Sequence, residues 1–473
     1  MSSTPLIQAS RGMNYLFLTQ TLCNFSFYGI KSIFVLYAIQ QLSLDNSQAI
    51  TLFATFMTLA YATSLIGGTI ADKLLGVKNT ILVGGFLSFS GMLCFALPSQ
   101  EMCFLGLALI SLGSGFFKPN LSAAVGLFFK DSKDPSKDNA YSLFYMAMNL
   151  GSLLAPLASG FVSKRYGWSY GILLVAMALL CATYIFYKKV KFIGHIESGL
   201  PLSRTNVLLI IFFVISLITL FYHMFIYRDS FHGMMGIIAI GSVVYLGTIF
   251  YQCTPLERTD VSHIIISILL FTFFCALFEQ AGSSLMLFFE HGVNRDVLGT
   301  TIPSSAFLSF SPLFVLVVSP ILIFMFKSHF EKTKPMEDFL KIGIGFIFVS
   351  LSFLILAYSS FQRTSLVSVG WVVGAILIQT VGELLVVPII LSTISKFAPL
   401  RFRSVMMSFW LMDIAYGHYF AGFIAQFSIG KPLETSANAM ERYGAFFLWL
   451  GLMPLAVAVF LLSYQGMKRW RQT

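Results

Sequence analysis

The chain has 473 residues, of which 57% are hydrophobic and only 11% are charged. A soluble domain carries roughly 25% charged residues, so this composition excludes an ordinary aqueous fold. The formal net charge of +10 does not require a nucleic-acid partner, because the cytoplasmic loops of membrane proteins collect Lys and Arg. The six cysteines show neither metal-site spacing nor a disulfide framework. We therefore expect an all-α polytopic membrane protein.

Apolar runs recur along the whole chain at lengths of about 18–25 residues, each enough to cross a bilayer as a helix. We expect fourteen spans, near residues 14–41, 48–71, 79–98, 102–127, 140–163, 168–188, 205–226, 232–252, 262–289, 306–326, 339–360, 366–395, 403–429 and 443–466. The segments between them are too short for an additional soluble domain. The first run is also too long for the core of a signal peptide.

The Lys and Arg residues are distributed unevenly between the predicted loops. With the N-terminus inside, about three times as many lie on the inside as on the outside, a bias typical of cytoplasmic loops. We therefore expect both termini to be cytoplasmic. The segments 128–139 and 189–204 mix both signs of charge and are expected to be solvated connections.

The seventh and eighth predicted spans have almost no polar residues and are expected to face lipid at the periphery. The predicted organisation is an N-terminal six-helix bundle (1–190), a linker with two accessory helices (191–260) and a C-terminal six-helix bundle (261–473). Two six-helix halves around a midplane cavity are the architecture of the major facilitator carriers.

A lysine followed by a proline lies deep inside the fourth predicted span, in the sequence Gly113-Ser114-Gly115-Phe116-Phe117-Lys118-Pro119-Asn120. A charge at membrane depth costs from about 3 to more than 10 kcal/mol, so it normally faces a water-filled cavity or a charged partner. Lys118 therefore predicts a polar path through the molecule, which favours transport.

A glycine-rich segment with charges, residues 67–78, connects the second and third predicted spans. Gly67 and Gly68 permit close helix approach, and Asp72 with the lysines that follow it can pair with helix ends at the cytoplasmic face. The segment is either a conformational latch or a generic tight turn, and it is similar to the loop motif of major facilitator carriers.

Further segments carry a more specific resemblance. They are Lys118-Pro119-Asn120, residues 143–152 (LFYMAMNLGS), residues 278–284 (FEQAGSS), residues 382–388 (GELLVVP) and residues 396–399 (KFAP). In this order and at these depths, they resemble the proton-coupled oligopeptide transporter family in its bacterial fourteen-helix form. The resemblance implies secondary active transport of di- and tripeptides or related small zwitterions by alternating access. It also implies a bacterial inner-membrane location, a monomer, no cofactor, and a proton gradient as the driving force.

The first predicted span departs from that family. The family usually carries Glu-x-x-Glu-Arg here, a cluster associated with proton coupling and with binding of the peptide carboxylate. In this chain the positions hold Gln20, Cys23 and Asn24. Gln and Asn form hydrogen bonds but do not titrate. The alternative hypothesis is therefore an uncoupled or differently coupled carrier, by uniport or efflux, of a non-peptide small molecule.

Two pairs of charged residues within the spans are suggested by the resemblance. Lys31 would meet Glu279 near the outer mouth, and Lys118 would meet Glu383 near the inner mouth. Such pairs would act as gates between the halves and could exchange protons, because burial and a neighbouring cation shift a carboxyl group's proton affinity in opposite directions.

Asp413 is the third acid that lies well inside a predicted span. It is either a substitute proton-coupling site or a structural hydrogen-bond acceptor. His418, five residues later on the same predicted helix, is expected to make an ordinary polar helix contact.

A set of polar and aromatic side chains would suit a small zwitterion, because amides bind its polar groups and aromatic rings form pocket walls at low entropy cost. The predicted substrate-binding residues are Tyr28, Tyr61, Lys118, Tyr145, Asn149, Gln280, Ser284, Glu383 and Trp410. Phe27 stands where the family usually has tyrosine, and Ser311 stands where it usually has asparagine. The chain has no nucleotide-binding loop, zincin motif or nucleophile elbow, so we do not expect an enzyme.

Overall fold

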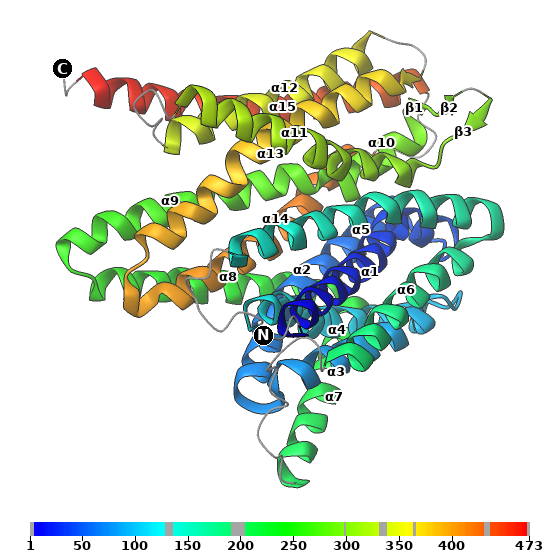
Figure 1. The fold of residues 1–473 in the computed structure, drawn as a ribbon. Coiled ribbons are helices and arrows are strands. Elements are labelled where there is room, and N and C mark those ends of the chain that lie inside the picture. Colours follow the sequence, from blue (N-terminus) through cyan, green and yellow to red (C-terminus); the bar gives the residue numbers. More distant parts are fainter. Residues whose placement is uncertain are drawn as a thin grey trace. The chain divides into compact units, whose positions relative to one another are not determined.

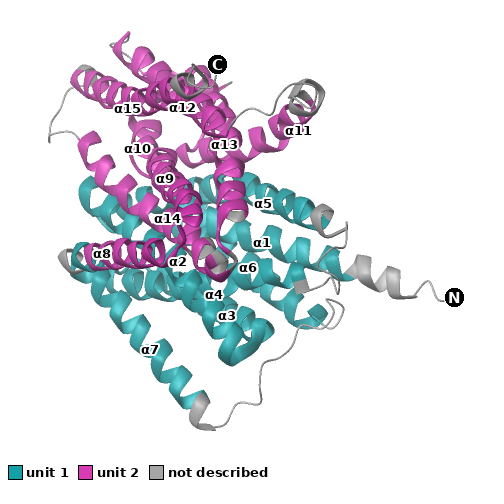
Figure 2. Cartoon of the chain, turned by 90° about the vertical axis from the view of Figure 1, so that its left-hand side faces the viewer, with its two compact units in different colours: residues 1–235 teal, residues 236–473 magenta. Residues whose placement is uncertain are grey.

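The computed structural model describes residues 4–127, 136–190, 204–297, 299–330, 338–362, 366–429 and 436–470. The chain divides into two compact units, Met1–Met235 and Gly236–Thr473, shown in teal and magenta in Figure 2. Most of the two predicted charged connections, at 128–139 and 189–204, lies outside the described residues. The predicted division at residues 190 and 260 stays a prediction.

Unit 1 consists of long helices that follow one another along the chain (Figure 1). They are α1 (Thr4–Gln40), α2 (Asn46–Ile70), the π-helical turn η1 (Ala71–Leu75), α3 (Gly76–Phe95), α4 (Gln100–Leu127), α5 (Ser136–Tyr166), α6 (Trp168–Lys189) and α7 (Arg204–Ile226). The next helix, α8 (Arg228–Gln252), begins in unit 1 and continues in unit 2.

Unit 2 begins with a span that is broken in the middle. This span comprises α9 (Pro255–Phe278), the 3₁₀ turn η3 (Glu279–Gly282) and α10 (Ser284–His291). The remaining helices are η4 (Ser304–Ser309), α11 (Phe310–Phe330), α12 (Asp338–Phe361), α13 (Val369–Phe397), η5 (Leu400–Phe402), α14 (Arg403–Ala425), η6 (Gln426–Ser428) and α15 (Ser436–Trp470).

Four two-residue strands lie among the connections of unit 2. They are β1 (Val293–Asn294), β2 (Asp296–Val297), β3 (Thr300–Thr301) and β4 (Val367–Ser368). β1 pairs with β4 in parallel, and β2 pairs with β3 antiparallel. They lie in connections between helices, and the paired residues Val293 and Val367 are buried in the hydrophobic core of unit 2.

The helical content confirms the predicted all-α polytopic class. Each of the fourteen predicted spans coincides with a helix or, for the ninth, with the broken run from α9 to α10. Within the described residues, twelve stretches are long and apolar enough to cross a membrane, and one of them, Asn46–Phe95, contains both α2 and α3. α7 and α8 are the least buried of these helices, consistent with lipid-facing accessory helices.

Glycines bring α2 and α4 into close contact beneath Lys118. A Cβ atom at Gly67 would collide with the carbonyl oxygen of Gly115. Pro119 has no N–H to donate to that carbonyl, which lies four residues earlier in α4. Asn120 reinforces the contact, because its amide nitrogen donates to the carbonyl oxygens of Gly67 at 3.2 Å and Phe116 at 2.8 Å. The Lys-Pro-Asn segment is thereby fixed to the glycine-rich end of α2.

In unit 2, α12 packs along α15 and α13. A close approach positions α13, since a Cβ atom at Gly382 would lie 2.8 Å from the carbonyl oxygen of Gly345. Glu383 follows Gly382, so its side chain projects roughly 100° around α13 from this contact. The tight packing against α12 therefore sets the direction of the Glu383 carboxylate.

Candidate functional site

Lys118 is enclosed by aromatic side chains of unit 1. Its ammonium nitrogen lies 3.0 Å from the ring centroid of Phe27, 5.4 Å from that of Tyr61 and 5.8 Å from that of Tyr28. Phe27 meets Tyr28 and Tyr61 edge to face, with centroids 5.8 and 6.1 Å apart. A cation over an aromatic face gains about 0.5–2 kcal/mol, more when desolvated. α1, α2 and α4 thus converge on one positive charge.

Lys31 is the other lysine that lies within a predicted span of this unit. It lies one turn after Tyr28 on α1, with its ammonium nitrogen 5.4 Å from the Tyr28 ring centroid, and only 6% of the residue is exposed. Tyr28 therefore lies between two cations, where its ring contributes to stabilising both. This arrangement makes Tyr28 a more central residue than the sequence suggests.

The residues that replace the family's charged motif hold α1 against α5. Gln20 donates to the side-chain oxygen of Asn24 at 3.5 Å, and the Asn24 amide nitrogen donates to the carbonyl oxygen of Met148 at 3.2 Å. The helices are close here, because a Cβ at Gly151 would collide with the carbonyl oxygen of Thr21. Neutral amides at these positions thus support helix packing.

Asn149 and Tyr145 lie one turn apart on α5. The Asn149 amide nitrogen donates to the carbonyl oxygen of Tyr145 at 3.0 Å, and the Tyr145 side chain is exposed. This bond orients the Asn149 amide and uses one of its two N–H donors. The amide group also has an oxygen acceptor. The Asn149 amide therefore keeps polar atoms for a ligand, beside the exposed Tyr145 side chain.

Two predicted site residues of unit 2 lie at the break of the ninth span. Gln280 is buried and donates to the carbonyl oxygens of Ala276 at 3.0 Å and Ala421 at 3.1 Å. The Ser284 hydroxyl donates to the Gln280 side-chain oxygen at 2.5 Å. These bonds satisfy backbone and side-chain groups where the helix is interrupted, which is the normal requirement for a broken helix at membrane depth.

Glu279 lies beside a histidine at this break. Its Oε2 atom is 3.5 Å from Nδ1 of His418 on α14, and both side chains are almost fully buried. His418 was expected to make an ordinary polar contact, so the pairing with an acid is a finding of the structure. Contact between two helices about 140 residues apart leaves no trace in hydrophobic periodicity, and the only sequence signal is a histidine within a span.

Asp413 and Trp410 of α14 lie at the contact between this helix and α9, which we call the α9–α14 seam. The Asp413 Oδ1 atom accepts from the Thr272 hydroxyl at 3.1 Å, and the residue is 1% exposed. Its Oδ2 atom has no hydrogen-bond partner among the described residues. Trp410 stacks on Phe271 with centroids 3.8 Å apart and planes at 10°. Both readings of Asp413 stay open, since one oxygen atom is bonded to Thr272 and the other has no partner among the described residues.

The two predicted gating pairs, Lys31 with Glu279 and Lys118 with Glu383, each join one unit to the other. They stay predictions. Within its own unit, each lysine has an aromatic neighbour and Glu279 has a histidine neighbour. Lys31, Lys118 and Glu279 consequently lie in defined local surroundings.

Comparison with known proteins assigns this arrangement to a family. Residues 78–439 match the POT family, more than half of the chain. The chain belongs to the POT family. It is 28% identical over 446 residues to dipeptide and tripeptide permease A of Salmonella typhimurium, covering 93% of this chain and 88% of that protein. The corresponding permease of Escherichia coli K12 is 27% identical, with the same coverage.

Solved structures of POT transporters share the fold. A crystal structure of the peptide transporter POT in complex with sulfate superimposes with a TM-score of 0.86 at 26% identity, covering 97% of this chain and 94% of that one. A POT family transporter in complex with 5-aminolevulinic acid gives a TM-score of 0.84 at 25% identity, with 96% coverage of both chains. The present POT protein is thus a multi-pass membrane transporter of the major facilitator type and not an enzyme.

Proposed function

We propose that this POT protein carries di- and tripeptides, or closely related small zwitterions, across the bacterial inner membrane by alternating access. The observation that carries the proposal is the ammonium group of Lys118, half-buried at membrane depth among the rings of Phe27, Tyr28 and Tyr61. A fixed cation with aromatic walls suits a peptide carboxylate with an adjacent side chain. The permeases of Salmonella and Escherichia coli support the same substrate class.

Substrate contacts would come from both units under this proposal. In unit 1, Tyr28, Tyr61, Tyr145 and Asn149 would surround the peptide backbone, with Lys118 at its carboxylate. In unit 2, Glu383 would receive the amino terminus. Gln280, Ser284 and Trp410 would act mainly by holding the α9–α14 seam in shape, given their hydrogen bonds and stacking contact.

Proton coupling would reside in unit 2, because the acidic first-helix motif is absent. The candidates are Glu279 with its neighbour His418, and Asp413 with Thr272. Both contacts lie between α9 or η3 and α14, so a change of proton occupancy would alter the interaction between these elements. Lys31 and Glu383 would complete the gates. The permeases favour this coupled peptide carrier over the uncoupled alternative.

The proposal includes cytoplasmic N- and C-termini, a monomeric state and no resident cofactor. The excess of Lys and Arg in alternate loops supports the orientation. A substituted-cysteine labelling experiment with a membrane-impermeant maleimide on intact cells tests it: a cysteine introduced near residue 165 should react, and one near residue 188 should not.

The substrate class can be tested by thermal shift of the purified protein. A ligand that binds only the native state stabilises it by RT ln(1 + [L]/Kd), about 2.7 kcal/mol at a hundredfold excess over Kd. Dialanine and trialanine should raise the melting temperature, and free alanine or nitrate should not. Stabilisation by nitrate alone, or by no di- or tripeptide in a broad panel, would contradict the proposal.

A further inference from the structure

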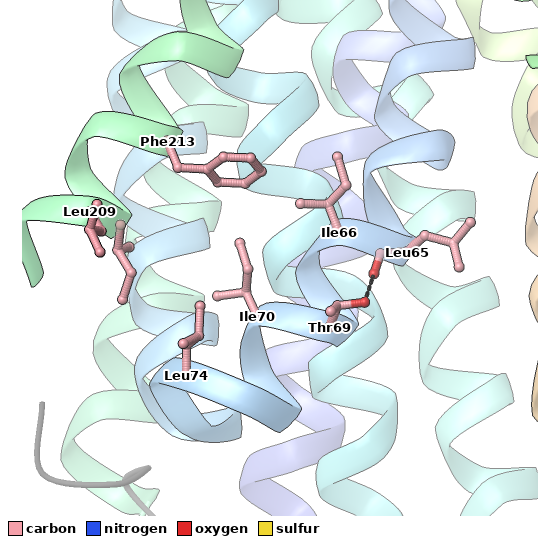
Figure 3. Close-up of a pocket in the computed structure, with 8 residues that line it drawn as sticks. Leu65, Ile66, Thr69, Ile70, Leu74, Leu209 and Phe213 are labelled. Atoms are coloured by element: carbon pink, nitrogen blue, oxygen red, sulfur yellow. Dashed lines mark hydrogen bonds between the residues drawn. The ribbon is translucent and has the colours of Figure 1, made fainter. Parts of the chain in front are cut away.

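A groove in unit 1 opens between the accessory helix α7 and the C-terminal end of α2. It has a volume of about 560 Å³ and is lined by Leu65, Ile66, Thr69, Ile70 and Leu74 on one side and by Leu209, Ile210 and Phe213 on the other. Figure 3 shows the Phe213 ring of α7 projecting toward Ile66 and Ile70 of α2, with Leu74 of η1 below them. The volume lies within the range of about 300–1,000 Å³ that is typical of small-molecule sites.

The lining offers almost nothing for a polar ligand to bind. Seven of the eight lining residues are aliphatic or aromatic. The only hydroxyl group, that of Thr69, donates to the carbonyl oxygen of Leu65 at 2.8 Å, drawn as the dashed line in Figure 3. The groove therefore suits a hydrocarbon chain and would not hold a peptide or an ion.

Within the described part of α7, the buried contacts lie toward its C-terminus. Toward its C-terminus, Phe221 and Phe225 are buried, and the Phe225 ring stacks with that of Phe104 on α4 at 6.5 Å between centroids. Toward its N-terminus, Leu209 and Phe212 are 62% and 72% exposed. The exposed half of α7 faces the groove from one side and the bilayer from the other.

Basic residues lie at the η1 end of the groove. Lys73 is exposed and immediately precedes the lining residue Leu74, and Lys78 follows within the first turn of α3. Asp72, also exposed, supplies one opposing charge, so this turn keeps a net positive charge. Lysines at the end of a hydrophobic groove complement a phosphate group at the membrane surface.

We propose that the groove binds one acyl chain of a phospholipid whose phosphate lies at the η1–α3 turn. Transfer from bilayer to groove yields no hydrophobic gain, since lipid tails are as apolar as leucine side chains. Selective binding must instead come from filling a space that would otherwise leave its walls without packing partners, and from the phosphate–lysine contact. The bound lipid would hold the free half of α7 against α2.

The test compares two adjacent residues of α7. Leu209 lines the groove, whereas Leu208 is 66% exposed and does not line it. Leu209→Trp fills the groove, and Leu208→Trp adds the same side chain outside it. Native mass spectrometry of the detergent-solubilised full chain, titrated with phosphatidylglycerol, measures the dissociation constant of the first lipid. Leu209→Trp should raise it at least tenfold, and Leu208→Trp should leave it within twofold of the parent value.

Two further measurements complete the test. Lys73→Gln should weaken phosphatidylglycerol binding severalfold more than Lys164→Gln, a change at an exposed lysine in the last turn of α5. A phospholipid with a diazirine at mid-chain should label peptides 65–74 and 204–226 of the unaltered protein. Equal lipid binding by both tryptophan variants, or labelling spread evenly over all helices, would overturn the proposal. The groove between α7 and α2 would then be an ordinary lipid-contacting surface.

Discussion

Replacing Lys118, which lies among three aromatic rings, distinguishes a substrate-binding role from a structural one. Lys118→Met keeps a long side chain between Phe27, Tyr28 and Tyr61 but removes the charge. The cation–π contact at 3.0 Å contributes about 0.5–2 kcal/mol, which is offset by the cost of keeping a charge at membrane depth. Lys118→Met should therefore lower the free energy of unfolding by no more than about 2 kcal/mol.

Peptide binding should change much more than folding. Removing one partner of a desolvated charge pair costs about 2–5 kcal/mol, which corresponds to a loss of affinity of roughly thirtyfold to several thousandfold. The same loss should occur in the parent protein when the peptide carboxylate is replaced by an amide. If both changes remove the same contact, the two losses are not additive.

The assay is a thermodynamic cycle with two proteins and two ligands. Isothermal titration gives the affinity of dialanine and of dialanine amide for the parent and for Lys118→Met, with Lys188→Met as a control at an exposed lysine. The parent and the control should prefer the carboxylate strongly, and Lys118→Met should bind both ligands equally. A variant that keeps the full carboxylate preference would refute the assignment of Lys118.

Other predictions concern coupling and packing. Glu279→Gln should abolish accumulation of peptide driven by a pH gradient while preserving peptide exchange in a counterflow assay; unchanged accumulation would count against its role. If Asp413 carries the proton, Asp413→Asn should likewise lose accumulation and keep counterflow exchange. Normal accumulation with a lower melting temperature would instead establish Asp413 as a structural hydrogen-bond acceptor. Gly67→Val should destabilise the protein by at least about 1–3 kcal/mol through overpacking against Gly115. Gly68→Ala should not destabilise the protein, because a Cβ atom at Gly68 would lie in open space. Equal melting temperatures for the Gly67→Val and Gly68→Ala variants would contradict the close packing of α2 against α4.

The helices of this protein were predictable because hydrophobic run length alone identifies membrane spans. Every predicted span coincides with a helical segment, including the two sparsely buried accessory helices. The prominence of Lys118 was also predictable, since a charge within an apolar run is expensive wherever the helix lies. Tyr28 and Tyr61, which the sequence groups with Lys118 in one predicted site, lie beside it. The shortest contact, with Phe27, was not predicted, because the side of α1 that faces α4 depends on helix packing.

The interruption of the ninth span and its contacts were beyond sequence reasoning. Nothing in residues 278–284 requires a 3₁₀ turn, and the break is compensated by Gln280 bonding to a helix far along the chain. The Glu279–His418 contact likewise depends on the register of α14 against η3. Such pairings between distant helices are set by tertiary packing, whereas periodicity reports only on which residues are apolar.

The proposed function requires that this chain carry peptides and couple them to a proton gradient without an acidic first-helix motif. Reconstitution in proteoliposomes tests it directly, with labelled dialanine outside and an imposed pH gradient, acidic outside. Labelled dialanine should accumulate saturably inside the proteoliposomes. A protonophore should abolish this accumulation, and excess unlabelled tripeptide should inhibit it by competition. Peptide equilibration that is insensitive to both the gradient and the protonophore would contradict the coupling, and absence of any saturable peptide flux would contradict the function itself.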